Sequence, residues 1–271
     1  MRVLAISDLH TDFKENWRLV EQIPDSLRSD DVLIVAGDIA DSTEVIKRTL
    51  SLLRSKFKMV LYTPGNHELW VRNKDYDSVE KLYRILRLCH SLDVKTAPTK
   101  VNDIWIVPLF SWYDLEFDSD PADDGLDGWA DFHFCKWPHR VRQVHEYFIE
   151  MNAPNIKRYD GDVISFSHFL PRIDLLPAKE NLRFKGLTKV AGCRLLESQI
   201  RELKSIIHVF GHSHINMDCV IDGVRYVQNA LSYPVERSEA NLLLKEVWDF
   251  TTATQKIAPG GLKIETDGKS L

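Results

Sequence analysis

The sequence predicts an α/β fold, in which buried strands alternate with amphipathic helices that cover the faces of a sheet. Short runs rich in valine, isoleucine and leucine each end in a polar cluster, as buried strands of a parallel sheet do. Between them, longer stretches carry apolar residues at helical spacing. The expected strands are VLAIS before Asp8, VLIVA before Gly37, MVLYT before Gly65, VISFS before His168 and IIHVF before Gly211. The expected helices cover residues 14–22, 43–55, 78–92, 140–151 and 193–204.

Two further runs, MDCVIDG and VRYVQNA, follow the last of these strands and meet at Asp222 and Gly223. An Asp-Gly pair between apolar runs favours a two-residue turn, because both central positions of that turn require a positive φ. We therefore expect a β-hairpin here and, with it, a second sheet.

The composition is that of an ordinary globular protein. Of 271 residues, 44% are hydrophobic and 28% are charged, which excludes a disordered or fibrous chain. The formal net charge of -5 provides no positive field to gather long nucleic acids or an anionic membrane. We expect one domain over residues 1–256 and a flexible tail over residues 257–271.

The chain carries no pattern that predicts export or membrane insertion. No stretch approaches the roughly 18 uninterrupted apolar residues of a membrane-spanning helix, and the first residues lack the pattern of a signal peptide. The cysteines are scattered without a CxxC pair, at Cys89, Cys135, Cys193 and Cys219. This spacing favours reduced thiols, so we expect a cytoplasmic location.

The segment 111–138 departs from the alternation, because it carries many aromatic residues among acidic ones. Its aromatic residues are Trp112, Tyr113, Phe117, Trp129, Phe132, Phe134 and Trp137. Long loops of this kind are often functional, so the segment could form a lid over a site. It could equally be an insertion that packs its aromatic side chains against the domain. The sequence leaves these two interpretations open.

Polar clusters follow all five expected strands. They contain Asp8 and His10, Asp38 and Asp41, Asn66 with His67 and Glu68, His168, and His212 with His214. Open α/β sheets bind their ligands at the carboxyl ends of strands, so these side chains are expected to converge. Carboxylate and imidazole groups without a thiolate suit metal ions such as manganese, iron, zinc or cobalt.

Each cluster has a simpler interpretation when it is taken alone. An Asp-x-His at a strand end is more often a turn with a capping carboxylate than a metal site. The Gly-Asn-His-Glu stretch fits a turn in which Asn66 takes a left-handed conformation. However, five separate turns would have to place seven potential metal ligands after strands by chance. The joint pattern therefore favours a metal site.

In order along the chain, the clusters read DxH, GDxxD, GNHE, a lone histidine and GHxH. This pattern resembles that of the calcineurin-like metallophosphoesterase superfamily, and all five blocks lie between positions 8 and 214. The resemblance implies a four-layer α/β/β/α sandwich, made of two mixed sheets flanked by helices, with a site for two metal ions. The activity that it implies is hydrolysis of a phosphoester.

The resemblance also implies a role for each motif residue. The implied ligands are Asp8, His10 and His214 for one ion, Asn66, His168 and His212 for the other, and Asp38 as the bridge between them. Two such ions lower the pKa of a bridging water, whose hydroxide then attacks phosphorus. His67 would face the phosphate or the leaving oxygen and donate a proton. Asp41 and Glu68 would orient a histidine, although a helix-capping role is equally open for Glu68.

The substrate is less constrained than the chemistry. Ser42 follows Asp41 at the position where related protein phosphatases carry a phosphate-binding arginine. Arg72 or Arg172 could supply that cation instead. We expect hydrolysis of a small phosphomonoester or phosphodiester, with neither a membrane nor a long nucleic acid as partner, and the oligomeric state stays open. The alternatives are a phosphoprotein phosphatase and a non-catalytic binding scaffold of the same fold.

Overall fold

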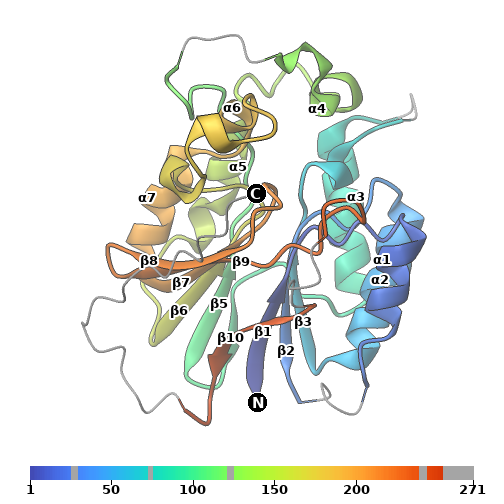
Figure 1. Ribbon diagram of the computed structural model, residues 1–271. Helices are drawn as coiled ribbons and strands as arrows, with labels where there is room; N and C mark the ends of the chain where they lie inside the picture. The colour runs from blue at the N-terminus through green and yellow to red at the C-terminus, as the bar shows by residue number, and fades with distance from the viewer. Residues whose placement is uncertain (26–29, 73–75, 121–124, 238–242, 253–271) are drawn as a thin grey trace.

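Two β-sheets lie face to face at the centre of the molecule, and helices cover the outer face of each (Figure 1). The computed structural model describes residues 1–25, 30–72, 76–120, 125–237 and 243–252. The arrangement confirms the expected four-layer α/β/β/α sandwich of two mixed sheets. The expected tail, residues 257–271, lies outside the described residues.

The first sheet has four strands in the order β10-β1-β2-β3. Its strands are β1 (Arg2–Ile6), β2 (Val32–Ala36), β3 (Met59–Thr63) and β10 (Lys245–Asp249). β1, β2 and β3 run parallel, whereas β10 pairs antiparallel with β1. Every residue of β2 is buried, because the second sheet covers one face of this strand and helices cover the other.

The second sheet has six strands in the order β4-β5-β6-β7-β9-β8, with antiparallel pairs at its two edges. Its strands are β4 (Thr99–Val101), β5 (Ile104–Pro108), β6 (Asp162–Phe166), β7 (Ser205–Phe210), β8 (Met217–Ile221) and β9 (Val224–Gln228). The predicted hairpin is formed by β8 and β9. Its turn residues Asp222 and Gly223 have φ values of 49° and 80°, as the expected two-residue turn requires.

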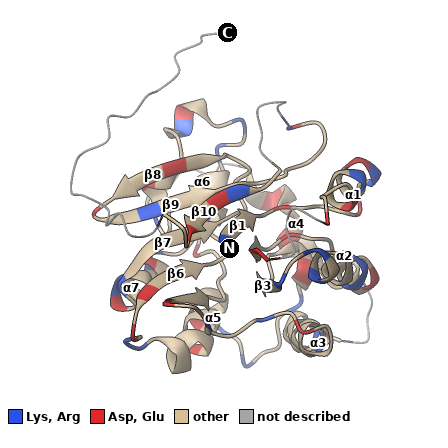
Figure 2. Ribbon diagram, turned by 90° about the horizontal axis from the view of Figure 1, so that it is seen from below, with Lys and Arg blue, Asp and Glu red and all other residues tan. Residues whose placement is uncertain are grey.

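Helices cover both sheets, as Figure 2 shows from below the strands. The outer face of the first sheet carries α1 (Lys14–Glu21), α2 (Thr43–Lys56) and α3 (Ser78–Ser91). The outer face of the second sheet carries α5 (Val144–Asn152) and α7 (Arg194–Glu202). Two short helices, α4 (Ala130–Phe134) and α6 (Leu187–Val190), lie beyond the carboxyl ends of the strands (Figure 1). Short 3₁₀ helices are η1 (His67–Leu69), η2 (Leu126–Gly128), η3 (Ala153–Asn155), η4 (Ile173–Leu175) and η5 (Lys179–Asn181).

All five predicted helices are present, and one begins later than predicted. α5 begins at Val144 instead of residue 140. The reason is a turn just before the helix, in which the Val141 N–H donates to the Pro138 carbonyl oxygen at 2.8 Å.

The two sheets meet through a layer of buried, mostly β-branched side chains. This layer includes Val3, Val32, Ile34, Leu61, Ile106, Ile164, Phe166, Ile207 and Val209. Since successive side chains of a strand point to opposite faces, Leu4, Leu33 and Val35 pack instead against the helices of the first sheet. Both faces of the central strands are therefore fixed by close packing, and so are the positions of the strand ends.

Three aromatic residues of the segment 111–138 pack against the domain, whereas Phe132 is 47% exposed. Trp112, Tyr113 and Phe117 are 3%, 6% and 0% exposed. Trp112 stacks on Phe148 of α5 and meets Trp137 edge to face. The packing interpretation is therefore correct for these residues. Residues 121–124 of the segment lie outside the described residues.

Among the described helices, none is long and apolar enough to cross a lipid bilayer. The four cysteines are free thiols in the structure. Cys89 and Cys193 are buried, whereas Cys135 and Cys219 are partly exposed.

Candidate metal centre

The candidate ligands lie on loops at the carboxyl ends of β1, β2, β3, β6 and β7, which meet at the upper edge of the two sheets in Figure 1. Half of the ten non-glycine residues with a positive φ in the described chain are candidate ligands. They are Asp8 (51°), His10 (41°), Asp38 (55°), His212 (73°) and His214 (58°). A left-handed backbone costs about 1–2 kcal/mol per residue, and such strain is commonly found at functional sites.

Hydrogen bonds between neighbouring loops hold this strained backbone in place. The N–H groups of Asp8 and His10 donate to the carbonyl oxygens of Gly37 and Asp38, at 3.0 and 2.9 Å. The His212 N–H donates to the Asp8 carboxylate at 2.9 Å. The loops after β1, β2 and β7 thus form one connected unit.

Glu68 is fully buried and binds backbone N–H groups rather than a histidine in the described structure. Its carboxylate accepts from Asp38, Ile39 and Gly65 at 3.0, 2.6 and 2.7 Å. The bond to Gly65 spans the start of η1, as in a helix cap. Glu68 therefore ties the loop after β2 to the loop after β3.

Glycine is required where these loops approach one another. A Cβ atom on Gly65 would lie 2.2 Å from Asp38 Oδ1 and 2.8 Å from His168 Cε1. A Cβ atom on Gly37, whose φ is +83°, would lie 2.4 Å from His168 Nδ1. Any other residue at these positions would displace a candidate ligand.

Asp8, His10 and His214 form a first group of potential metal ligands. The Nε2 atoms of His10 and His214 are 3.2 Å apart, and His214 Nε2 lies 3.4 Å from Asp8 Oδ1. On its other side, His214 Nδ1 lies 2.6 Å from Glu236 Oε2. Because a carboxylate only accepts, Nδ1 carries a hydrogen, and Nε2 is the atom available to a metal ion.

A proton competes with a metal ion for His214 Nε2. Burial disfavours a charged His214, but Asp8 and Glu236 outweigh that effect and raise the pKa of His214 to about 9. Without a cation, the Nε2 proton therefore sits between His214 and Asp8. Binding of a metal ion would displace this proton.

His168, His212 and Asn66 form a second group, together with Asp38. His168 Nδ1 lies 3.0 Å from the Ala36 carbonyl oxygen, and His212 Nε2 lies 3.0 Å from the Val190 carbonyl oxygen. A carbonyl oxygen only accepts, so each of these nitrogens carries the ring hydrogen. The other ring nitrogens then present lone pairs, and they lie 3.2 Å apart.

The amide of Asn66 adds a third lone pair at the same point. Its Oδ1 lies 3.0 Å from His168 Nε2 and 3.1 Å from His212 Nδ1. Its Nδ2 donates to Asp131 Oδ1 at 2.9 Å, which fixes the orientation of the amide. Three acceptors so close together repel one another, and a cation between them removes that repulsion.

Asp131, on α4, is a residue that sequence reasoning missed. It is 2% exposed and accepts hydrogen bonds from Asn66, Trp70 and Trp129. The three distances are 2.9, 2.6 and 2.9 Å. Asp131 thus connects the aromatic segment 111–138 to a candidate ligand.

Asp38 lies between the two groups of potential ligands. Its Oδ2 is 3.5 Å from His168 Nε2 and 3.8 Å from His67 Nε2. Burial raises the pKa of Asp38 well above its ordinary value, and the neighbouring carboxylates of Glu68 and Asp8 add to the effect. Cations on either side would stabilise the ionised carboxylate. The residues present therefore fit two metal ions that share Asp38.

His67 lies beside both groups, at the rim of the centre. Its ring packs over the Trp70 indole with 3.8 Å between centroids, and its Nε2 lies 3.2 Å from the Tyr233 hydroxyl oxygen. Burial, with the nearby histidines His168 and His214, lowers the pKa of His67 to about 3. The ring is neutral when no anion is bound.

The structure places Asp41 against an arginine rather than a histidine in the described chain. The Arg72 guanidinium donates to the Asp41 carboxylate at 2.5 Å and lies over the ring of Phe134. The buried ammonium group of Lys81 donates to the Asp41 carbonyl oxygen at 2.6 Å. Asp41 therefore holds Arg72 near Trp70, whose ring covers His67.

Arg172, the other arginine considered as a phosphate ligand, is surrounded by carboxylates. Its guanidinium contacts Asp174, Glu197 and Asp222 at 2.7, 3.3 and 3.1 Å. Three acidic partners compensate its charge, which leaves Arg72 as the better placed of the two cations.

Tyr233 and Glu236 also reach the centre and were missed by sequence reasoning. Both follow β9, which lies parallel to β7, so they lie at the same edge of the sheet as the motif residues. The sequence already predicted β9 as part of the hairpin. Because sites lie at the carboxyl ends of strands, the loop after β9 could have been named as part of the site.

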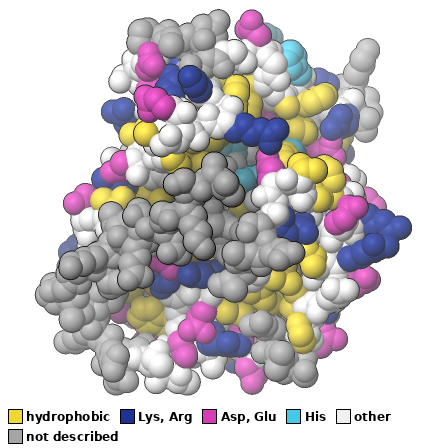
Figure 3. Space-filling view, in the orientation of Figure 1, with side chains coloured by type: hydrophobic (Ala, Val, Ile, Leu, Met, Phe, Trp, Pro, Cys, Tyr) yellow, Lys and Arg dark blue, Asp and Glu magenta, His cyan; other side chains and the backbone are white. Residues whose placement is uncertain are grey.

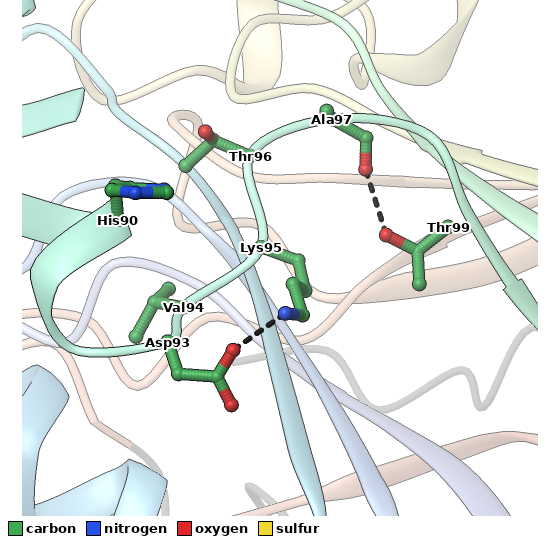
Figure 4. A pocket seen from close by; sticks show the side chains of 7 residues that line it. All are labelled: His90, Asp93, Val94, Lys95, Thr96, Ala97 and Thr99. Atoms are coloured by element: carbon green, nitrogen blue, oxygen red, sulfur yellow. Dashed lines mark hydrogen bonds and ion pairs between the residues drawn. The ribbon is translucent and has the colours of Figure 1, made fainter. Parts of the chain in front are cut away.

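Histidine side chains reach the surface near the middle of the face shown in Figure 3. Figure 4 shows a separate hollow of about 220 Å³, lined by His90, Asp93, Val94, Lys95, Thr96, Ala97 and Thr99. None of the candidate ligands lines this hollow. Lys95 and Asp93 form an ion pair within it, at 2.5 Å.

Comparison with known proteins identifies the family of the chain. Residues 1–216 match the family model of the calcineurin-like phosphoesterases. The acyl-carrier-protein phosphodiesterase PptH of Mycobacterium tuberculosis is 31% identical over 262 residues, which cover 86% of this chain and 78% of the relative. The crystal structure of phosphopantetheinyl hydrolase (PptH) from Mycobacterium tuberculosis has a TM-score of 0.75 and 26% identity, and the match covers 91% of this chain and 95% of that one. The chain therefore belongs to the calcineurin-like phosphoesterase family and is a hydrolase that acts on phosphoester bonds.

Proposed function

We propose that the chain hydrolyses the phosphodiester that joins a phosphopantetheinyl group to an acyl carrier protein. The convergence of lone pairs from Asn66, His168 and His212 beside Asp38 carries the chemical part of this proposal. The substrate is supported by the relative PptH, an acyl-carrier-protein phosphodiesterase similar to this chain over most of its length. The sequence predicted a small phosphomonoester or phosphodiester; the proposed substrate keeps the phosphodiester bond but carries it on a protein.

The proposed metal ligands converge in two groups on either side of Asp38. They are Asp8, His10 and His214 for one ion, Asn66, His168 and His212 for the other, and Asp38 between them. When bound, two cations polarise the phosphoryl oxygens and make a nucleophile from water. Manganese, iron, zinc or cobalt suits these oxygen and imidazole donors.

The remaining roles belong to residues at the rim. His67 Nε2 lies 3.8 Å from Asp38 Oδ2, so it points to where a phosphate would sit and can donate a proton to the leaving oxygen. Arg72 is the proposed phosphate-binding cation, and Asp41 acts by holding its guanidinium in place. The chain needs no protein nucleophile for this reaction.

A cytoplasmic location belongs to the same proposal. It is supported by the four free thiols, which persist where the surroundings are reducing. Fractionation of cells that produce the protein tests it, and recovery of the protein outside the cytoplasm would contradict it.

The test of the activity is the release of phosphopantetheine from a loaded carrier protein, followed by mass spectrometry. Wild-type protein supplied with manganese should release it, whereas chelated protein and Asp38→Asn should not. Asp103→Asn, in the exposed turn between β4 and β5, is the matched control and should keep full activity.

Three outcomes would redirect the proposal. Full activity in Asp38→Asn or in chelated protein would refute the metal-dependent mechanism. Hydrolysis of simple diesters without release from the carrier protein would keep the chemistry and reject this substrate. Hydrolysis of nothing at all, with no metal bound, would favour the non-catalytic scaffold.

A further inference from the structure

The loop after β9, residues 229–237, adds groups to the centre that lie outside the family match. That match ends at residue 216. The ring of Tyr233 stacks on His10 with 4.3 Å between centroids and 30° between planes. Its hydroxyl oxygen lies 3.2 Å from His67 Nε2. Tyr233 thus contacts a proposed metal ligand and the proposed proton donor at once.

This loop is held rigidly against the centre. Ser232, just before Tyr233, has a φ of 65°, a strained conformation for a residue with a side chain. Its N–H donates to the Asp8 carbonyl oxygen at 3.0 Å, and its own carbonyl oxygen accepts from the fully buried Asn16 amide at 2.8 Å. Glu236, farther along the loop, binds His214. The position of Tyr233 is therefore fixed by bonds on both sides.

The ring of His67 also meets His10 edge to face, with 4.8 Å between centroids, and its Nε2 lies 3.8 Å from Asp38 Oδ2. Its backbone N–H donates to Asp38 Oδ1 at 3.1 Å, and Trp70 packs on one face of the ring. The carboxylate of Asp41, expected to orient a histidine, binds Arg72 instead. Within the described structure, the Tyr233 hydroxyl is the hydrogen-bond partner of the His67 ring.

We propose that Tyr233 is a positioning residue, whose ring and hydroxyl hold the His67 imidazole beside the place of the leaving oxygen of the substrate. This inference rests on the proposed function, in which an oxygen from water bonds to phosphorus and the phosphorus–oxygen bond to the leaving group breaks. The bonding electrons stay on the leaving oxygen, which takes the Nε2 proton of the His67 imidazolium and leaves the ring neutral. The Nε2 lone pair then accepts a hydrogen bond from the Tyr233 hydroxyl again, and no bond of Tyr233 breaks.

The inference predicts a dependence on the leaving group. An alkyl leaving oxygen, such as that of a phosphopantetheinyl ester, is strongly basic and needs the proton. A nitrophenyl oxygen leaves readily without it. A residue that merely supported the fold would affect both substrates equally.

Tyr233→Phe tests this, because phenylalanine keeps the ring against His10 and removes only the hydroxyl. We expect kcat/KM to fall roughly 10-fold or more on an alkyl phosphodiester and to change by less than about 3-fold on bis-nitrophenyl phosphate. Metal content should stay at the wild-type level. Tyr147→Phe is the matched control, since its hydroxyl on α5 lies 3.4 Å from that of Tyr83. This variant should leave kcat/KM unchanged on both substrates. Equal losses on the two substrates would overturn the inference.

A double variant separates positioning from a direct effect. In a His67→Gln background, Tyr233→Phe should cause no further loss on the alkyl substrate, because its partner is gone. Additive losses would overturn the inference.

A spectroscopic readout separates this inference from the proposed function. Inactivity of the wild type on both diesters would refute the function. Nitrogen NMR of histidine-labelled protein would still test whether the Tyr233 hydroxyl contacts the His67 ring. The ring nitrogen shifts of His67 should change in Tyr233→Phe while those of the buried His208 stay constant, and unchanged His67 shifts would overturn the inference.

Discussion

At the scale of single residues, the hydrogen bond made by the outer nitrogen of each candidate ligand determines whether its inner atom offers a lone pair to a cation. His168 and His212 give their outer N–H groups to backbone carbonyl oxygens, and Asn66 gives its amide N–H to Asp131. The atoms that face the centre, His168 Nε2, His212 Nδ1 and Asn66 Oδ1, must therefore present lone pairs. Specificity for a cation is therefore built by hydrogen bonds outside the centre as much as by the ligands.

Gly65→Ala should disrupt the centre without removing any ligand. The new Cβ atom would overlap Asp38 Oδ1 and press on His168, so both ligands must move. We expect loss of bound metal and a decrease of about 1–3 kcal/mol in the free energy of unfolding. Gly128→Ala is the control, since a Cβ atom there meets open space. Metal analysis and urea unfolding of both variants would measure this, and wild-type metal content in Gly65→Ala would contradict it.

His208 makes the stability of the fold depend on pH. Its buried ring contacts the hydroxyl groups of Ser165 and Ser167, and burial lowers its pKa to about 3. The unfolded chain, with a histidine pKa near 6.5, binds a proton that the folded protein excludes. The contribution of His208 to stability is thus complete above the pKa of the unfolded chain, near 6.5, and decreases as the pH falls toward the pKa of the folded protein, about 3. At pH 5 the decrease is about 2 kcal/mol.

Urea unfolding at pH 7.5 and pH 5, with chelator present, measures this contribution. His208→Asn should lose about 2 kcal/mol less than the wild type between the two pH values. If both proteins lose the same free energy, another group is responsible.

The sequence points to the candidate ligands and not to the groups that hold them in place, for a physical reason. Metal ligands must be particular side chains, so Asp8, His10 and the others leave a pattern of letters. Their supports include the carbonyl oxygens of Ala36 and Val190, which any residue provides. No sequence pattern can identify such partners.

At the scale of elements, the five strands predicted from apolar runs have most of their residues buried, whereas the hairpin of β8 and β9 was predicted from its turn. β2 is buried throughout and forms a continuous apolar run. β10, which was not predicted, lies at a sheet edge, and of its five residues only Val247 is buried. β4 has three residues, too few for a periodic signal. Edge strands depend on their neighbours for pairing, which the local sequence does not show.

Asp131 connects α4 to the candidate ligand Asn66. We expect Asp131→Asn to weaken binding of the ion that Asn66 would hold roughly 10- to 100-fold, because an amide cannot accept from all three donors around it. Competition with a chelator would measure the affinity. Asp127→Asn, an exposed change in the same segment, should leave affinity unchanged. Equal affinity in the two variants would show that α4 does not orient Asn66.

At the scale of the whole molecule, each sheet supplies about half of the centre. Asp8, Asp38 and Asn66 follow strands of the first sheet, whereas His168, His212 and His214 follow strands of the second. The relative position of the sheets therefore determines the distances between ligands. Ions bound there would connect the two sheets at one edge, in addition to the apolar layer between them.

Metal binding should accordingly raise the stability of the whole fold. At a hundredfold excess of free ion over its dissociation constant, each occupied site adds about 2.7 kcal/mol, provided that the unfolded chain does not bind the ion. For a chain of this size that corresponds to roughly 5 °C or more in Tm. Calorimetry of chelated protein with and without manganese would measure the shift. Asp38→Asn should lose most of it, because that carboxylate lies close to His10 on one side and to His168 and His212 on the other, while Asp103→Asn should keep it. A Tm that responds to neither manganese nor chelator would contradict a metal site between the sheets.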